Sequence, residues 1–308
     1  MQNLKLEIPE IKQYPDDCVS PLFTGHPTMM YWINANNKFC KTNKDNCLGF
    51  YSECLDNERK ISEFFIDKNY SECISPPSTS NTDEEGNLTI FQKAFYEGDL
   101  FNYLQEGNTG IETVVLFLES LKKILISLSK YKIIHGDLCL ENFMVSKTDK
   151  LRFILVDFGC SQVLNEDKVY EWDFNYLKFI RPYLVSPYLQ QYYKEKSYMN
   201  RDEFYNFLLN KELFTIGVIL YKIVYSYDLW NPKKEYSTDE KFIELLNVRN
   251  HIKLCHKNAF GKLQKILEII LKLTPIEIDD IITLDEFLNL IDDLLLESNK
   301  KRKIDCTY

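Results

Sequence analysis

The stretches that decide the fold are "IIHGDLCLENF" (residues 133–143) and "FILVDFGCS" (residues 153–161). The first sets three polar residues at fixed offsets between apolar ones: His135, Asp137 and Asn142. In the second, an apolar run leads directly into Asp157, Phe158 and Gly159. The apolar runs on either side of "SKTDKL" predict a β-hairpin, which would bring Asn142 and Asp157 to the same end.

Phosphoryl transfer requires these residue types. The charge of a polyphosphate is neutralised by a metal ion, which hard oxygen atoms must hold. The accepting hydroxyl group needs a carboxylate within hydrogen-bonding reach. Asp137 can supply that carboxylate, whereas Asn142 and Asp157 can supply a carbonyl and a carboxylate oxygen to the metal.

The two stretches resemble the catalytic loop (H-R-D-x-x-x-x-N) and the metal-binding loop (D-F-G) of the protein kinase superfamily. The resemblance implies an α+β, bilobal protein-kinase-like fold, with a small β-rich N-lobe and a large, mainly helical C-lobe. It implies ATP and Mg²⁺ as cofactors, Asp137 as the catalytic carboxylate, and Asn142 and Asp157 as metal ligands. His135 is expected to brace the catalytic loop rather than to take part in the chemistry.

Two residues of the catalytic loop depart from the family pattern. Gly136 stands where the family has Arg, which implies activity without phosphorylation of the activation segment. The same H-G-D sequence occurs in aminoglycoside and choline kinases, so a small-molecule acceptor stays open. Cys139 stands where serine/threonine kinases place a Lys that contacts the transferred phosphate. We interpret Cys139 and Cys160 as small space-filling residues, with redox sensing as the alternative.

The small lobe needs a strand Lys for the nucleotide phosphates and a helical Glu to orient it. "KFCK" (residues 38–41) resembles the strand motif V-A-I-K, which nominates Lys41, although Lys38 and Lys44 compete. Glu58 would share a helix face with Ile61 and Phe65, which turns its carboxylate inward. Glu63 points away from that face and is the weaker candidate.

The remaining nucleotide contacts are less well marked in the sequence. Gly25 is the one glycine in "LFTGHPTMMYW", and so few glycines predict a poor phosphate loop. "TIFQKAFYEGDLFNYL" resembles the hinge between the lobes. Its adenine-binding backbone would come from Lys93, Ala94 and Phe95. Glu97 or Asp99 would meet the ribose.

The periodicity of the chain predicts where the two lobes divide. Residues 1–95 form the expected N-lobe and residues 96–308 the C-lobe, together one kinase domain. Residues 75–87, rich in Pro, Ser, Thr and acids, are predicted to be a surface loop. Apolar residues at steps of three and four predict a helix from residue 111. Further helices are predicted at 203–209, 211–225, 239–256, 260–273 and 284–297.

The large lobe carries a second resemblance to the family. "KELFTIGVILYKIVY" (residues 211–225) is similar to its central buried helix, D-x-W-S-x-G-V, with Glu212 at the Asp position and Phe214 at the Trp position. This favours the protein kinase branch. Tyr188 replaces the Glu of the A-P-E motif, and its usual Arg partner is absent from residues 273–287. Both halves of one buried ion pair are therefore missing together.

Composition excludes several other classes of protein. The 37 Lys and Arg against 46 Asp and Glu give a net charge of −9, which argues against nucleic acid as a partner. Nine scattered cysteines without C-x-x-C spacing, and a start without a signal segment, predict a cytoplasmic protein. The longest apolar run contains Lys222 and is too short for a membrane span. Lys300–Lys303 is either a solvated helix end or a nuclear localisation patch.

The sequence therefore predicts a divergent serine/threonine protein kinase that transfers the γ-phosphate of ATP to protein hydroxyl groups. Its protein substrate or binding partner is not identified by the sequence. A pseudokinase that serves as an interaction module is the first alternative, because the glycine loop is poor and Cys139 replaces a Lys. A small-molecule kinase is the second.

Overall fold

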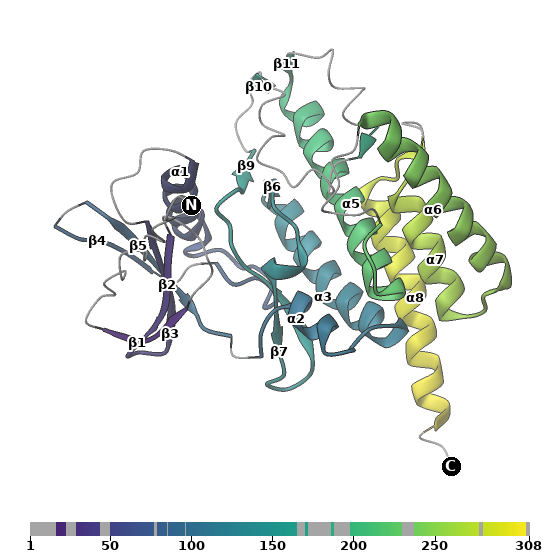
Figure 1. The fold of residues 1–308 in the computed structure, drawn as a ribbon, viewed down its shortest axis with the longest axis horizontal. Coiled ribbons are helices and arrows are strands. Elements are labelled where there is room, and N and C mark those ends of the chain that lie inside the picture. The colour runs from purple at the N-terminus through teal and green to yellow at the C-terminus, as the bar shows by residue number, and fades with distance from the viewer. Residues whose placement is uncertain are drawn as a thin grey trace, which may run out of the picture.

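The computed structural model describes eleven segments of the chain: residues 17–22, 29–43, 50–76, 79–84, 86–95, 97–164, 170–171, 186–187, 198–229, 237–276 and 280–305. A β-sheet with one helix lies at one end, and a mainly helical part lies at the other (Figure 1). This arrangement confirms the expected α+β, bilobal fold. The boundary between residues 95 and 96 stays a prediction.

The small lobe is built on one antiparallel sheet with the strand order β1-β2-β3-β5-β4. Its strands are β1 (Cys18–Leu22), β2 (Met29–Asn34), β3 (Lys38–Asn43), β4 (Thr79–Thr82) and β5 (Leu88–Lys93). Helix α1 (Phe50–Phe65) packs on β3 and β5, with Leu55 against Ile90 and Met29. The sheet therefore carries Lys41, on β3, beneath a helix that carries Glu58.

Strand β4 corrects the prediction that residues 75–87 form a loop. All four residues of β4 are exposed, so the segment lacks the alternation of apolar and polar residues that marks a half-buried strand. It pairs with β5 at the edge of the sheet, from Thr79 opposite Phe91 to Thr82 opposite Leu88. A tight turn follows, in which Asn87 N donates to Asp83 Oδ1 at 2.7 Å.

The large lobe is formed mainly by helices packed around one apolar core. These are α2 (Leu100–Gln105), α3 (Ile111–Lys130), α5 (Arg201–Tyr225), α6 (Thr238–Asn258), α7 (Lys262–Leu273) and α8 (Leu284–Asp305). The two helices predicted at 203–209 and 211–225 are one continuous helix, α5, because Asn210 does not interrupt it. A capping box between Asn200 and Glu203 sets its start.

The two loops that carry the motifs described above, residues 135–142 and 156–161, lie between short strands at the centre of the molecule. Strands β7 (Phe143–Ser146) and β8 (Arg152–Leu155) form the predicted hairpin, with Phe143 opposite Leu155. The 3-10 turn η1 (Leu140–Asn142) precedes it. Strands β6 (Ile133–Ile134) and β9 (Gln162–Val163) pair on the other side of the loops. These two pairings hold residues 135–142 next to residues 156–161.

The outer helices complete the lobe. Arg249 of α6 is buried, and its Nη1 donates to the carbonyl of Leu271 at 2.6 Å and to that of Thr274 at the end of α7.

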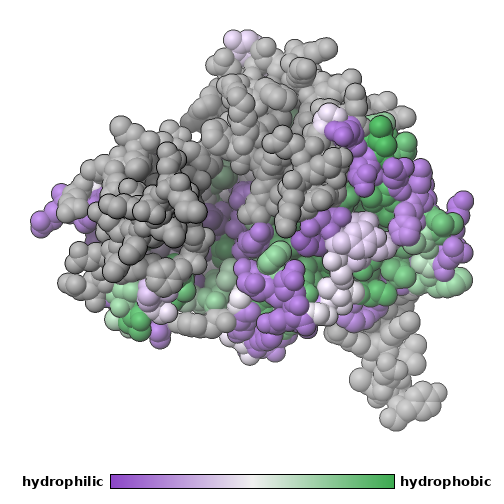
Figure 2. Space-filling view, in the orientation of Figure 1, coloured by the Kyte–Doolittle hydropathy of each residue, from purple (hydrophilic) through white to green (hydrophobic). Residues whose placement is uncertain are grey.

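Hydrophilic and hydrophobic side chains are interspersed over the α6 side of the molecule (Figure 2). No described helix combines the length and apolar character needed to cross a bilayer. The short strands β10 (Tyr170–Glu171) and β11 (Tyr198–Met199) also pair.

Candidate active site

Asp137 and Asn142 are joined directly by hydrogen bonds. The Nδ2 of Asn142 donates to Oδ2 of Asp137 at 3.1 Å and to the Asp137 carbonyl at 2.8 Å. Asn142 is also anchored to the hairpin, since Val156 N donates to its carbonyl at 3.0 Å. The amide nitrogen of Asn142 therefore orients the Asp137 carboxylate, and its Oδ1 is the atom suited to a cation.

His135, the first residue of the catalytic-loop motif, is fully buried. Its Nε2 lies 2.9 Å from the Val156 carbonyl, which can only accept, so Nε2 carries the proton. Burial lowers the pKa of His135, so the ring is neutral near pH 7. The position fits the expected brace between the two loops, since a fully buried side chain does not face a substrate.

Asp157 follows the hairpin in an uncommon backbone conformation, with φ of 62°. Non-glycine residues adopt this left-handed region rarely, and such strain concentrates at functional sites. The Asp157 side chain is 48% exposed and its Oδ1 lies 3.0 Å from Lys41 Nζ. Partial burial opposes ionisation, but the Lys41 ammonium lowers the pKa of the Asp157 carboxyl. Asp157 is therefore a carboxylate at neutral pH.

Lys41 bridges Asp157 and Glu58. Its Nζ forms an ion pair with Glu58 Oε2 as well as with Asp157 Oδ1. Burial alone would lower the pKa of Lys41, but the charges of Asp157 and Glu58 outweigh it and raise the pKa. Lys41 is thus held protonated at the junction between the sheet, helix α1 and the metal-binding loop. Glu63, the weaker candidate, is exposed and pairs with Arg59 instead.

The buried face of α1 reaches the metal-binding loop. Glu58, Ile61 and Phe65 are all buried on this face, as the expected helix geometry requires. Phe65 packs edge-on against Phe158, with ring centroids 5.7 Å apart. Phe158 in turn packs against His135 at 5.0 Å. A chain of aromatic contacts therefore links the small-lobe helix to the catalytic loop.

Asn57 is a contact that sequence reasoning missed. Its Nδ2 donates to the carbonyls of Phe158 (3.3 Å), Gly159 (2.9 Å) and Ser161 (2.7 Å). These bonds attach α1 to the backbone of the metal-binding loop. The signal available in the sequence was its position, one residue before Glu58.

Helix α5 fixes the catalytic loop through both backbone groups of Gly136. Gly136 N donates to Glu212 Oε1 at 2.7 Å, and Lys211 Nζ donates to the Gly136 carbonyl at 2.6 Å. Burial raises the pKa of Glu212 to about 7 and lowers the pKa of Lys211. The role of Lys211 was not predicted, because a lysine in a buried helix is rare.

The replacement of Arg by Gly136 has a local structural cause. Gly136 has φ of 87°, and a Cβ at this position would lie 2.2 Å from the Cys160 carbonyl oxygen. A larger residue therefore does not fit between the two loops as they are packed here.

Cys139 is a core residue. It is 2% exposed and belongs to the apolar core of the large lobe. This agrees with its interpretation as a space-filling residue. The position therefore supplies no cation to a bound phosphate.

The donor atoms present fit Mg²⁺. Asp157 and Asn142 offer oxygen ligands, which are the kind that Mg²⁺ prefers, and half of the Asp157 side chain is accessible. Among the described residues, no group of three or more His, Cys, Asp or Glu residues could hold a metal alone. Mg²⁺ commonly uses one or two carboxylates and completes its shell with phosphates and water, so two protein ligands suffice.

The other predicted nucleotide contacts are only partly described. Lys93 ends β5, and Ala94 and Phe95 follow it towards the large lobe, where a hinge is expected. Asp99 accepts from Asn102 N at 2.8 Å as the N-cap of α2, and the ribose contact by Glu97 or Asp99 stays a prediction. Gly25 and Tyr188 lie outside the described residues.

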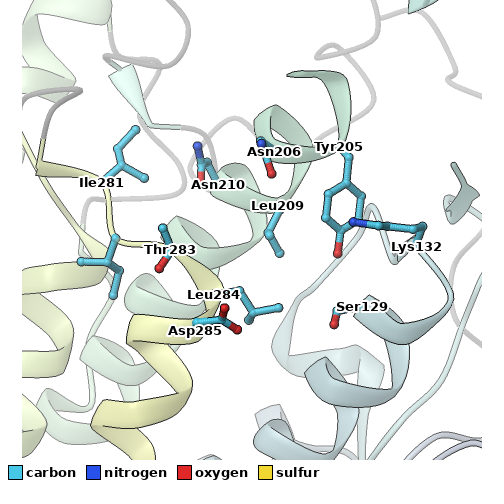
Figure 3. A pocket seen from close by; sticks show the side chains of 11 residues that line it. Ser129, Lys132, Tyr205, Asn206, Leu209, Asn210, Ile281, Thr283, Leu284 and Asp285 are labelled. Atoms are coloured by element: carbon cyan, nitrogen blue, oxygen red, sulfur yellow. The ribbon is translucent and has the colours of Figure 1, made fainter. Parts of the chain in front are cut away.

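A cavity of about 500 Å³ lies in the large lobe between α3, α5 and the start of α8. Figure 3 shows Tyr205 and Lys132 side by side on its wall, and the Lys132 Nζ lies 4.4 Å from the centre of the Tyr205 ring. Its described lining contains none of the residues discussed above for phosphate chemistry. The N-terminus of α8 is capped within the chain, since Glu286 N donates to Thr283 Oγ1 at 3.2 Å. We assign no ligand to this cavity.

Comparison with known proteins agrees with this geometry. Residues 70–304 match the family model described as "Protein kinase domain". The meiosis-specific serine/threonine-protein kinase mek1 of Schizosaccharomyces pombe is 30% identical over 148 residues, which are 46% of this chain and 31% of that protein. The aligned region thus spans about a third of the relative. Lys41 and Glu58 precede the family match, so their assignment rests on the contacts described above.

Proposed function

Because the chain belongs to the protein kinase family, we propose that it is an active serine/threonine protein kinase that uses ATP. The observation that carries this proposal is the double ion pair of Lys41 with Glu58 and Asp157. These ion pairs connect strand β3, helix α1 and the metal-binding loop, which a kinase must bring together to bind ATP. A D-F-G sequence that merely resembled the family motif would not require a buried cation at its Asp.

Each residue then has a distinct task. Lys41 contacts the nucleotide phosphates, and Glu58 holds its ammonium in place. Asp137 orients the accepting hydroxyl group and takes its proton, while Asn142 keeps the Asp137 carboxylate in position. Mg²⁺, when bound by Asp157 and Asn142, would neutralise charge on the phosphates. Lys93, Ala94 and Phe95 offer backbone groups to the adenine.

We propose that the enzyme does not depend on phosphorylation of its activation segment. Gly136 cannot make the contact from the family's Arg to a phosphorylated residue. Both its backbone groups are instead held by Lys211 and Glu212, so the position of the loop is set by helix α5. Treatment with a protein phosphatase should therefore leave the rate of phosphate transfer unchanged. A loss of more than about tenfold would contradict this proposal.

Serine and threonine are the proposed acceptors. The catalytic-loop sequence "LEN" resembles the serine/threonine pattern, and mek1 of S. pombe is named as a serine/threonine kinase. Incubation with radiolabelled ATP and either a pool of peptides or choline and aminoglycosides tests this, and phosphoamino-acid analysis of the peptides identifies the acceptor. Labelled phosphoserine or phosphothreonine is the expected result. Label on choline or aminoglycosides instead would favour a small-molecule kinase.

A pseudokinase is the second candidate, and the buried Cys139 favours it. The side chain at this position lies in the core, so the cation that usually contacts the transferred phosphate is replaced by an apolar contact. Thermal unfolding with ATP, in the presence and absence of Mg²⁺, separates the two candidates. An active kinase should show a higher Tm with both ligands. No shift, together with no phosphate transfer, would leave an interaction module as the function.

A further inference from the structure

Two cysteines from distant parts of the chain meet beside the proposed phosphate site. The thiols of Cys54, on α1, and Cys160, just after the metal-binding loop, hydrogen-bond to each other. Helix α1 packs closely here, since a Cβ on Gly159 would lie 3.1 Å from the Cβ of Cys54. Asn57, one turn further along α1, is bonded to the same loop. The backbone that carries each thiol is therefore packed closely against the other.

The two residues are less buried than most of the other described cysteines. Cys54 and Cys160 are partly exposed, whereas Cys40, Cys73 and Cys139 are buried. A small reagent can therefore approach this pair more readily than the buried cysteines.

The two thiols differ in reactivity. The hydrogen bond from Cys160 lowers the pKa of Cys54. Partial burial and the carboxylates of Asp157 and Glu58 oppose this, whereas the Lys41 ammonium adds to it. The same contact and burial raise the pKa of Cys160. Cys54 therefore forms the attacking thiolate more readily, and Cys160 is left as the resolving thiol.

We propose that Cys54 and Cys160 are a modification site at which a small-molecule disulfide forms a reversible disulfide bond between α1 and the metal-binding loop. The Cys54 thiolate attacks one sulfur of the small disulfide, whose S–S bond breaks and releases one small thiolate. Cys160 then loses its proton to that thiolate, and its sulfur attacks the Cys54 sulfur. The second small thiol leaves as a thiolate and takes up the proton that Cys54 lost. The small disulfide is reduced to two thiols, and the protein pair is oxidised.

The consequence for activity rests on the proposed function. The thiols meet while Lys41 is paired with Glu58 and Asp157, so the bond closes on that arrangement. It joins a helix of the small lobe to a loop of the large lobe, and it limits the lobe opening that nucleotide exchange needs. Oxidation should therefore stabilise the protein and slow its turnover.

To test this, the full chain is treated with glutathione disulfide, and the remaining free thiols are then blocked with N-ethylmaleimide. The peptides are mapped by mass spectrometry without reduction. The expected product is a peptide pair joined through Cys54 and Cys160, two hydrogens lighter than the separate thiols. It should vanish with reductant and in Cys54→Ser and Cys160→Ser. It should persist in Cys255→Ser, a matched control at another partly exposed cysteine. Either cysteine variant suffices if the other does not fold.

A second readout measures the effect of the bond. Oxidised wild type should gain about 5 °C in Tm and lose several-fold in the rate of ATP turnover, and reductant should reverse both changes. Glutathione adducts without a linked peptide, or a linked peptide that leaves Tm unchanged, would overturn the inference. Peptide mapping and Tm do not depend on phosphate transfer. An inactive protein that forms the linked pair would therefore contradict the proposed function and leave the modification site standing.

Discussion

The Nζ of Lys41 lies 3.0 Å from Oδ1 of Asp157, although 116 residues separate them in the sequence. The same ammonium group pairs with the buried Glu58. This contact connects strand β3, helix α1 and the metal-binding loop at one cation. Removal of the cation should therefore affect both stability and nucleotide binding.

Replacement of Lys41 by methionine leaves the Glu58 carboxyl group buried without its cation. Lys41→Met should lower the free energy of unfolding by about 3 kcal/mol and the rate of phosphate transfer by at least ~100-fold. Lys41→Met/Glu58→Gln should recover much of the stability, but not the transfer, because the buried charge is removed while the phosphate contact stays absent. Chemical denaturation and a radiolabelled ATP assay measure the two effects. Lys38→Met, on the same strand, is the control; equal losses there would contradict the assignment of Lys41.

Gly136 and Gly107 form a matched pair, because both have φ of 87°. A Cβ on Gly107 meets nothing within 4 Å, whereas one on Gly136 would lie 2.2 Å from the Cys160 carbonyl oxygen. Gly107→Ala should lower the free energy of unfolding by about 1–2 kcal/mol, because alanine is strained in this backbone conformation. Gly136→Ala should lower it by a further ~1–3 kcal/mol, because its Cβ overlaps the neighbouring loop, and should also reduce the rate of phosphate transfer. Equal costs in urea denaturation would show that the loops are not packed as described.

Asn57 should act as a positioning residue for the metal-binding loop. Asn57→Ala removes donors from three loop carbonyls and should cost about 1–2 kcal/mol. We expect a roughly tenfold rise in the Mg²⁺ concentration needed for half-maximal transfer, because Asp157 is held less firmly. Asp56→Ala, at a neighbouring site of exposed ion pairs, should change stability by less than about 1 kcal/mol. An unchanged Mg²⁺ requirement in Asn57→Ala would rule out the positioning role.

Glu212 should make the stability of the protein depend on pH. Burial raises its pKa to about 7 in the folded state from 4.5 in the unfolded chain. Between these values the folded state binds more protons, so stability falls as pH rises from about 4.5 to about 7, by up to about 3 kcal/mol. Glu212→Gln should flatten this part of the curve. Denaturation at several pH values tests it, and an identical slope in the variant would be the contrary result.

The sequence predicted the large lobe better than the edges of the small lobe. The hairpin around residues 147–151 and the helix that begins at Ile111 follow from strong apolar patterns, and both are present. Strand β4 was missed because its polar residues show no alternation and only pairing with β5 makes it a strand. The break expected within α5 was wrong because tertiary packing overrides the weak helix propensity of Asn210.

The contacts between elements that are distant in the sequence were the hardest to predict. Glu58 could be chosen over Glu63 from helix geometry, since only one of them shares a face with Ile61 and Phe65. Asn57, Lys211 and the Cys54–Cys160 contact depend on how distant elements approach each other. No local pattern encodes that approach. The cellular location and the role of Gly25 stay predictions, and the protein substrate or binding partner is not identified by the sequence.

The most direct test of the account compares Asp137→Asn with the wild type and with Asp149→Asn. Asp149 lies in the turn of the same hairpin and its side chain is 85% exposed, so it serves as a matched control. With radiolabelled ATP, Mg²⁺ and a peptide pool, the wild type and Asp149→Asn should transfer phosphate at similar rates. Asp137→Asn should be slower by at least ~100-fold with its Tm little changed. Equal rates for all three proteins, or no transfer by the wild type, would contradict the claim that Asp137 serves phosphoryl transfer.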